Sequence, residues 1–217
     1  MLNVEPHDVP ADMPQAFYDA LPTMIKNYTG IGLHSRDENY FLPMYLGDYR
    51  AAEYLASRPD WDGRTLVVMG TSMGGQQSWA VAGLDPKVTA MLVEVPAGAD
   101  LLAPLHGRAM TYPDWDVTKP EIRALAPYFD GVNFAGRIHV PSLVAMGFID
   151  ETCPPAGVWA AYNLIQAPKE AAPMIESPHN HMATPEELAP WTRRSAAWLE
   201  ALVHGKPPIA ATANAGN

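Results

Sequence analysis

The segment Gly70-Thr71-Ser72-Met73-Gly74 constrains the fold of this chain more than any other feature of its sequence. It is a G-x-S-x-G pattern between an apolar, β-branched run at residues 64–69 and a helix-like stretch at residues 76–82. In a nucleophile elbow, a strained serine projects its hydroxyl from the top of a sheet. We expect the two outer glycines of the segment to remove side chains that would collide in this turn, and Gly75 to let the helix pack closely. The pattern therefore predicts Ser72 as a nucleophile.

Composition favours one soluble domain that acts on a neutral substrate. The chain has 217 residues, and its 14 Lys and Arg against 24 Asp and Glu give a net charge of −10. This charge argues against nucleic acids and anionic membrane surfaces as partners. The single Cys153 excludes an intrachain disulfide framework, no run is as long as a membrane span, and residues 1–5 lack the features of a secretory signal. We expect the chain as written to be cytoplasmic, whereas a longer parent protein could be secreted.

Strand-like and helix-like segments alternate along the chain, which is typical of a mostly parallel sheet flanked by helices. We expect one domain over residues 1–204, in which the Pro- and Gly-rich stretch 96–119 is a long excursion over the site, and a frayed tail over residues 205–217. The predicted strands are 64–69, 88–95, 140–147 and 172–176, and the predicted helices are 14–26, 42–57, 76–82, 120–128, 155–165 and 185–203.

Two further catalytic candidates follow predicted strands, where parallel-sheet proteins place their chemistry. Asp150 comes after the strand at 140–147, and His179 comes after the strand at 172–176. The order Ser, Asp, His along the chain is that of the α/β-hydrolase fold and differs from the orders in two other serine hydrolase folds. In this interpretation His179 is the general base for Ser72, and Asp150 orients the imidazole.

Each of these residues has an alternative. Asp150 could cap the helix that begins near residue 154, and Asp130 is a second candidate acid, although it precedes its nearest strand. His181 competes with His179, and the two histidines together could suggest a metal site. With one cysteine and no carboxylate cluster nearby, we expect no metal and no other cofactor.

Several segments besides the elbow carry a resemblance to a known family. They are Tyr45-Leu46-Gly47-Asp48-Tyr49-Arg50-Ala51-Ala52, Ala56-Ser57-Arg58-Pro59, Tyr128-Phe129-Asp130 and Asn133-Phe134-Ala135, and above all Gly147-Phe148-Ile149-Asp150-Glu151-Thr152-Cys153-Pro154-Pro155 with Ala160-Ala161-Tyr162-Asn163 and Lys169-Glu170. Over roughly residues 40–203 the sequence resembles carbohydrate esterase family seven of the α/β-hydrolases, the acetyl xylan esterase and cephalosporin C deacetylase group. This resemblance places the acid at Asp150, and the family spacing from acid to histidine falls on His179.

The family implies removal of acetyl or other short acyl groups from xylo-oligosaccharides or related small esters through an acyl-enzyme on Ser72. The backbone N–H of Met73 is then one oxyanion donor, although family members often carry glutamine at this position. Tyr112, Trp115 and Trp159 are candidate substrate contacts, with core packing as the alternative for each. The other hypotheses are a hydrolase of the same fold with different specificity, such as a peptidase or a feruloyl or polyester esterase, and an inactive truncated relative.

The chain differs from the usual α/β-hydrolase fold in the part of the sequence that precedes its nucleophile strand. About four strands normally come first, whereas only sixty-three residues precede Arg64, and most of them read as helix or loop. The fold is therefore predicted to be N-terminally truncated, without the loop that gives the second oxyanion donor in the family. Since the nucleophile strand would then have an open edge, we expect a second copy of the chain or a rearranged N-terminal segment to cover it, and hence a homo-oligomer.

Overall fold

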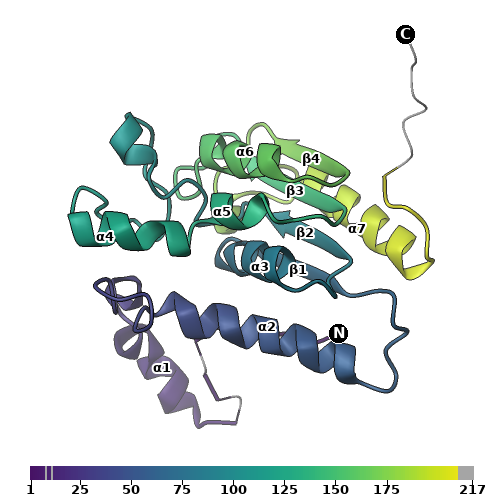
Figure 1. The fold of residues 1–217 in the computed structure, drawn as a ribbon, viewed down its shortest axis with the longest axis horizontal. Coiled ribbons are helices and arrows are strands. Elements are labelled where there is room, and N and C mark those ends of the chain that lie inside the picture. Colours follow the sequence, from purple (N-terminus) through teal and green to yellow (C-terminus); the bar gives the residue numbers. More distant parts are fainter. Residues whose placement is uncertain (8, 11, 210–217) are drawn as a thin grey trace.

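The protein is built on a parallel four-stranded sheet with the spatial order β1-β2-β3-β4, which is also the order along the chain (Figure 1). The computed structural model describes residues 1–7, 9–10 and 12–209. In one row across the sheet, Gly70, Val93, Val144 and Ala171 lie side by side. The strands are β1 (Val67–Thr71), β2 (Ala90–Glu94), β3 (Ser142–Gly147) and β4 (Lys169–Met174).

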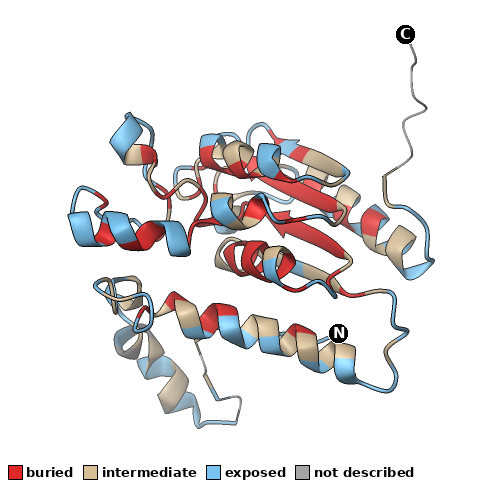
Figure 2. Ribbon diagram, viewed as in Figure 1, coloured by how far each residue is buried: buried red, intermediate tan, exposed pale blue. Residues whose placement is uncertain are grey.

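Successive side chains of the inner strands enter two different cores, because a strand turns alternate residues to opposite faces. Met91 packs against helices α3, α5 and α6 on one face, whereas Leu92 packs with Trp198 of helix α7 on the other. Figure 2 shows β2 and β3 as the most deeply buried layer between these helices. The helices are α3 (Met73–Leu84), α5 (Gly131–Ala135), α6 (Pro155–Leu164) and α7 (Ala189–Val203).

A third, aromatic cluster joins the N-terminal third of the chain to the excursion that follows β2. Phe41 of α2 packs edge-on against Trp115, which in turn packs edge-on against Phe129. The cluster also contacts the start of α3, next to Ser72. The remaining elements are α1 (Gln15–Met24), η1 (Tyr28–Gly30), α2 (Phe41–Ser57), η2 (Ala103–His106), α4 (Pro120–Leu125), η3 (Ala126–Tyr128) and η4 (Asn180–Met182).

The predicted mostly parallel α/β architecture is confirmed, but all four strands have other limits than expected, and two of them begin three residues from the predicted start. The nucleophile strand begins at Val67 rather than at residue 64, because the Asp62 carboxylate accepts the N–H groups of Arg64 and Thr65 and holds them in a turn. The last strand spans Lys169–Met174 rather than 172–176. Its charged start is compatible with a strand because the Lys169 ammonium donates to three carbonyls at the end of α6.

Two of the predicted helices begin several residues away from the expected position. Helix α3 begins at Met73, immediately after the nucleophile candidate, rather than at residue 76. Helix α7 begins at Ala189 rather than at residue 185, after turns in which Thr184 and Glu187 cap each other. The short helix α5 was not predicted, although Asp130 is an N-cap signal for it.

The outer edge of β1 pairs with no strand among the described residues. Leu2 and Val4 lie beside this edge, and together with β1, α2 and α3 they line a groove of about 370 Å³. The N-terminal segment therefore lies next to the edge of β1 but adds no strand to the sheet. Met69, in the middle of β1, is 49% exposed, so one face of this strand is open.

The described part of the chain contains no helix that is both long and apolar enough to cross a membrane. Of the predicted tail, residues 205–209 are described, and Ile209 packs against the cluster under α7. Residues 210–217 lie outside the described residues.

Candidate active site

The elbow around Ser72 has the strained geometry that the sequence predicts. Ser72 has φ 54° and ψ −117°, a conformation that a non-glycine residue adopts only where its surroundings enforce it. A Cβ on Gly70 would lie 2.2 Å from the backbone of Gly74, so only glycine fits there. The expectation for Gly74 is wrong, because a Cβ there would meet no atom within 4 Å. Gly75 permits a close approach of Pro96, in the loop after β2.

Ser72, His179 and Asp150 form one chain of hydrogen bonds across the carboxyl ends of β1, β4 and β3. The Ser72 Oγ lies 2.8 Å from His179 Nε2, and His179 Nδ1 lies 2.8 Å from Asp150 Oδ2. His179 and Asp150 are buried, whereas Ser72 is half-buried at the accessible end. The arrangement can remove a proton from the serine hydroxyl while the carboxylate stabilises the resulting imidazolium.

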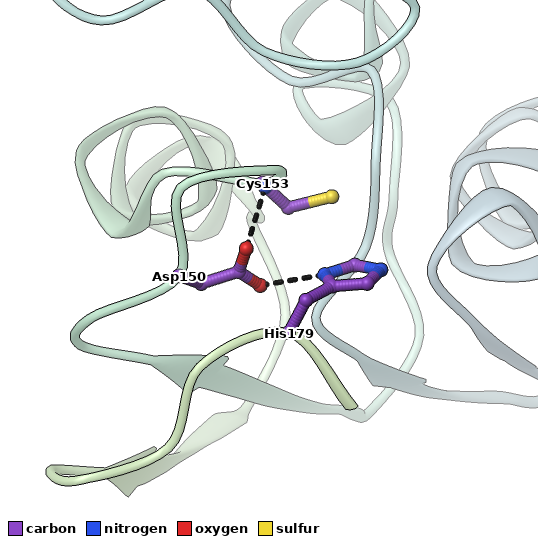
Figure 3. A group of neighbouring side chains, drawn as sticks. All are labelled: Asp150, Cys153 and His179. Carbon is purple, nitrogen blue, oxygen red and sulfur yellow. Dashed lines mark hydrogen bonds and ion pairs between the residues drawn. The ribbon is translucent and has the colours of Figure 1, made fainter. Parts of the chain in front are cut away.

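Backbone groups fix the carboxylate of Asp150 in the orientation that His179 requires. Its Oδ1 accepts the N–H groups of Thr152 and Cys153 at 2.9 and 2.8 Å, which leaves Oδ2 for the histidine (Figure 3). Gly147 brings the two loops together, because a Cβ there would lie 2.6 Å from the carbonyl oxygen of Ser177. Asp150 thus does order the turn before α6, as the capping alternative suggests, but only with one of its oxygens.

The two alternative residues lie in other environments. Asp130 accepts the N–H groups of Asp100, Leu101 and Val132, and so fastens the loop after β2 to the start of α5. His181 is exposed, and its ring makes an edge-to-face contact with the His179 ring, at 5.3 Å between centroids. The structure therefore brings Asp150 and His179 to Ser72, rather than Asp130 and His181.

Asp150, Cys153 and His179 also place three potential metal-ligand atoms within 4.8 Å of one another. Asp150 and His179 already bond each other through Oδ2 and Nδ1. Burial raises the pKa of the Cys153 thiol, and the charge of Asp150 adds to this shift, so the thiol stays protonated and is a poor ligand. The donor set suits proton transfer better than metal binding.

Helix α3 starts directly behind the nucleophile. Because the first N–H groups of a helix have no carbonyl partner within it, the Met73 N–H is available to an oxygen that becomes negative beside Ser72. The Ser72 carbonyl accepts from Gln76 and from Ala97, which holds the turn against the loop after β2. This geometry fits one half of an oxyanion hole.

Comparison with known proteins agrees with this geometry. The chain matches the acetyl xylan esterase (AXE1) family over residues 19–102 and 113–195. The protein belongs to the acetyl xylan esterase family. Over 192 residues it is 38% identical to the acetyl esterase Axe7A of Xylanibacter ruminicola, an alignment that covers 85% of this chain and 43% of Axe7A.

Solved structures of the acetyl xylan esterase family have the same fold. The enzyme from Paenibacillus sp. R4 matches with a TM-score of 0.67 and 28% identity, over 78% of this chain and 56% of that one. Acetyl xylan esterase 1 from Thermoanaerobacterium sp. JW/SL YS485 matches with a TM-score of 0.62 and 25% identity, over 85% and 59%. The chain has the α/β-hydrolase fold, and it spans about half the length of these relatives.

The three aromatic candidates of this family member differ in their surroundings. Trp115 is buried and donates its indole N–H to the Thr29 carbonyl, which fits core packing rather than substrate contact. Trp159 packs against the core cluster of α3, α5 and α6 and edge-on to Tyr162. Tyr112 alone reaches the elbow, with its hydroxyl 3.3 Å from the Met73 sulfur.

Sequence reasoning missed three residues beside the Ser72 site. Cys153 gave no signal beyond its place in the family block, although it follows Asp150 at the spacing of an Asx turn. Glu94 ends β2 and accepts the Thr71 hydroxyl, while burial raises its pKa against the opposing effects of Thr71 and His179. The Tyr28 hydroxyl contacts the Met73 sulfur. No local pattern predicts this contact, because forty-five positions separate the two residues.

Proposed function

We propose that this chain is a serine esterase that removes acetyl or other short acyl groups from acetylated carbohydrates or related small esters. The observation that carries the proposal is the continuous hydrogen-bond chain from Ser72 through His179 to Asp150, on a strained elbow, in a member of the acetyl xylan esterase family.

In the first step, the Ser72 oxygen attacks the ester carbonyl carbon and its proton passes to His179 Nε2. The carbonyl oxygen becomes negative and accepts the Met73 N–H. The bond from carbon to the alcohol oxygen then breaks, the alcohol takes the proton from His179, and the acyl group remains on Ser72. Two backbone N–H groups and the histidine stabilise the carboxylate of Asp150 during this step.

In the second step, water replaces the alcohol. His179 removes a proton from the water as the water oxygen attacks the acyl carbon, and the same oxyanion position is used again. The bond to Ser72 breaks, the serine recovers its proton from His179, and the acid leaves. This two-step course predicts ping-pong kinetics.

An acetylated xylo-oligosaccharide or a related neutral ester is the substrate class that we propose. The net charge of −10 disfavours anionic substrates, and the relatives that match are named for acetyl ester or acetyl xylan hydrolysis. The Met73 side chain makes this side of the site more apolar than the glutamine common in the family would.

The test is hydrolysis of p-nitrophenyl acetate and p-nitrophenyl butyrate by the purified chain beside its Ser72→Ala variant, with the oligomer mass measured on the same samples. We expect turnover that depends on Ser72 and favours acetate, and an acetyl group on Ser72 after rapid acid quench. A folded wild-type chain with no turnover would contradict the proposal. Faster cleavage of peptide anilides than of esters would instead favour the peptidase alternative.

We also propose that a second copy of the chain pairs with the outer edge of β1. Residues 65–73 contain no charged side chain, so two copies of this strand can lie antiparallel without opposing like charges. Their pairing would give the free N–H and C=O groups of the edge partners and would cover Met69.

A further inference from the structure

Two tyrosine hydroxyls meet at the side chain of the oxyanion residue. The hydroxyl oxygens of Tyr28 and Tyr112 lie 2.5 Å apart, and they lie 3.6 and 3.3 Å from the Met73 sulfur. Tyr28 comes from η1, in the segment before α2, and Tyr112 comes from the excursion after β2. Segments that are eighty-four positions apart thus converge beside the elbow.

The pair holds one hydrogen that has no strong acceptor. Of its two hydroxyl protons, one forms the hydrogen bond between the tyrosines, and the other faces the Met73 thioether, which is a weak acceptor. An anionic oxygen is a much stronger acceptor than a thioether. Burial raises the pKa of Tyr112 above its usual range, and the Tyr28 hydroxyl adds to the shift, so Tyr112 keeps its proton at neutral pH.

Both rings are held in place. The Tyr112 N–H donates to the Thr152 carbonyl at 2.9 Å, and the Tyr112 carbonyl accepts from Gly98 at 3.1 Å, which ties it to the Asp150 loop and to the loop after β2. The Tyr28 ring packs against the rings of His7 and Tyr40. A donor that is fixed before the reaction needs little reorganisation when charge develops.

Enzymes of this fold stabilise the oxyanion with two donors, and the Met73 N–H is one of them. In this fold the second oxyanion donor is an N–H from a loop that follows a strand preceding the nucleophile strand. Among residues 1–7, 9–10 and 12–66, the structure describes no strand that could carry that loop. Tyr28 belongs to this N-terminal part of the chain and contacts the residue that carries the first donor.

We propose that the Tyr28–Tyr112 hydroxyl pair is the second oxyanion donor of this esterase, an inference that rests on the proposed function. When Ser72 adds to the ester, the hydroxyl proton that faces the thioether turns to the new oxyanion. The proton stays on the tyrosine, and the O–H returns to the Met73 sulfur when the oxyanion collapses. The pair therefore stabilises charge without transferring a proton.

Steady-state kinetics on p-nitrophenyl acetate test this with Tyr28→Phe, Tyr112→Phe and the double variant. Each single variant keeps one hydroxyl, which can then donate alone, so we expect kcat to fall only about tenfold, whereas the double variant should lose about 10²- to 10³-fold in kcat, as when an oxyanion donor is removed. KM should change little. Tyr45→Phe is the matched control, because its buried hydroxyl bonds the Phe129 carbonyl in the same aromatic cluster.

Methylboronic acid supplies a readout that a structural role would not change. It adds to Ser72 as a tetrahedral anion that resembles the intermediate, so its affinity should fall in the double variant by the same factor as kcat, and should be unchanged in Tyr45→Phe. Equal boronate affinity and equal kcat in wild type and double variant would overturn the inference alone. A wild-type chain with neither a boronate adduct on Ser72 nor turnover would overturn the proposed function as well.

Discussion

Asp150 and His179 are matched atom to atom: the Oδ2 that faces the ring is the only carboxylate oxygen that the backbone leaves free. Oδ1 is occupied by two N–H groups of its own loop, so the carboxylate cannot rotate without breaking both bonds. The ring is thereby fixed with Nδ1 protonated and with Nε2 toward Ser72.

Asp150→Asn should therefore lower kcat by about 10⁴-fold with little change in fold, because an amide nitrogen facing Nδ1 favours the wrong tautomer. Asp130→Asn is the matched control. Its amide would leave one of three backbone N–H groups without an acceptor, at a cost of about 1–3 kcal/mol in the free energy of unfolding. We expect kinetics to show the larger loss of activity in Asp150→Asn, and denaturant melts to show the larger loss of stability in Asp130→Asn. A larger activity loss in Asp130→Asn would contradict the assignment.

The two neighbouring histidines should differ sharply. His179→Ala removes the base that contacts Ser72 and should lower kcat on the order of 10⁴-fold or more. His181→Ala removes an exposed ring that makes an edge contact with His179, so its activity should stay close to wild type. Parallel assays of the two variants on p-nitrophenyl acetate decide between them, and the reverse result would move the base to His181.

Much of this site was accessible from the sequence because its signals are local. The elbow, the strands that end before Asp150 and His179, and their order all lie in short segments with their own chemistry. The roles of Asp130 and Tyr28 could not be predicted in this way, because both depend on contacts across the fold. The strand at Lys169–Glu170 was missed for the same reason, since its charges are satisfied by α6 and by Arg194 of α7.

The two outer glycines of the elbow should respond differently to a methyl group. Gly70→Ala places a Cβ against the Gly74 backbone, so the turn must shift, at a cost of about 1–3 kcal/mol, and activity should fall with it. In Gly74→Ala the Cβ meets no atom within 4 Å, and alanine favours a helix over glycine by about 1 kcal/mol. Thermal melts and kinetics of both variants check this, and equal losses would show that the turn is tight on both sides.

Asp48 predicts a pH dependence of stability. Its Oδ2 is buried without a hydrogen-bond partner in the described residues, and burial raises its pKa to about 6, above the value of about 3.9 in an unfolded chain. Between pH 4 and 6, given these two pKa values, the folded state binds more protons than the unfolded one, so this group lowers stability as pH rises.

Asp48→Asn should consequently be more stable than wild type at neutral pH, with a difference that vanishes toward about pH 4, the unfolded-state pKa of aspartate. Chemical denaturation across this range measures it. Glu200→Gln is the control, because it neutralises an exposed carboxylate on α7. A difference between Asp48→Asn and wild type that stays constant with pH would contradict the argument.

The open edge of β1 gives the last prediction, a dimer that forms through this strand. In an antiparallel pair centred on Met69, each Met69 faces its copy, so Met69→Lys would place two positive charges opposite each other and should shift the protein toward monomer. Val203→Lys adds the same charge at an exposed, uncharged residue of α7, outside β1, and should leave the mass unchanged. Light scattering over a concentration series measures both. A wild-type chain that stays monomeric and folded throughout would show that β1 tolerates an unpaired edge with Leu2 and Val4 beside it.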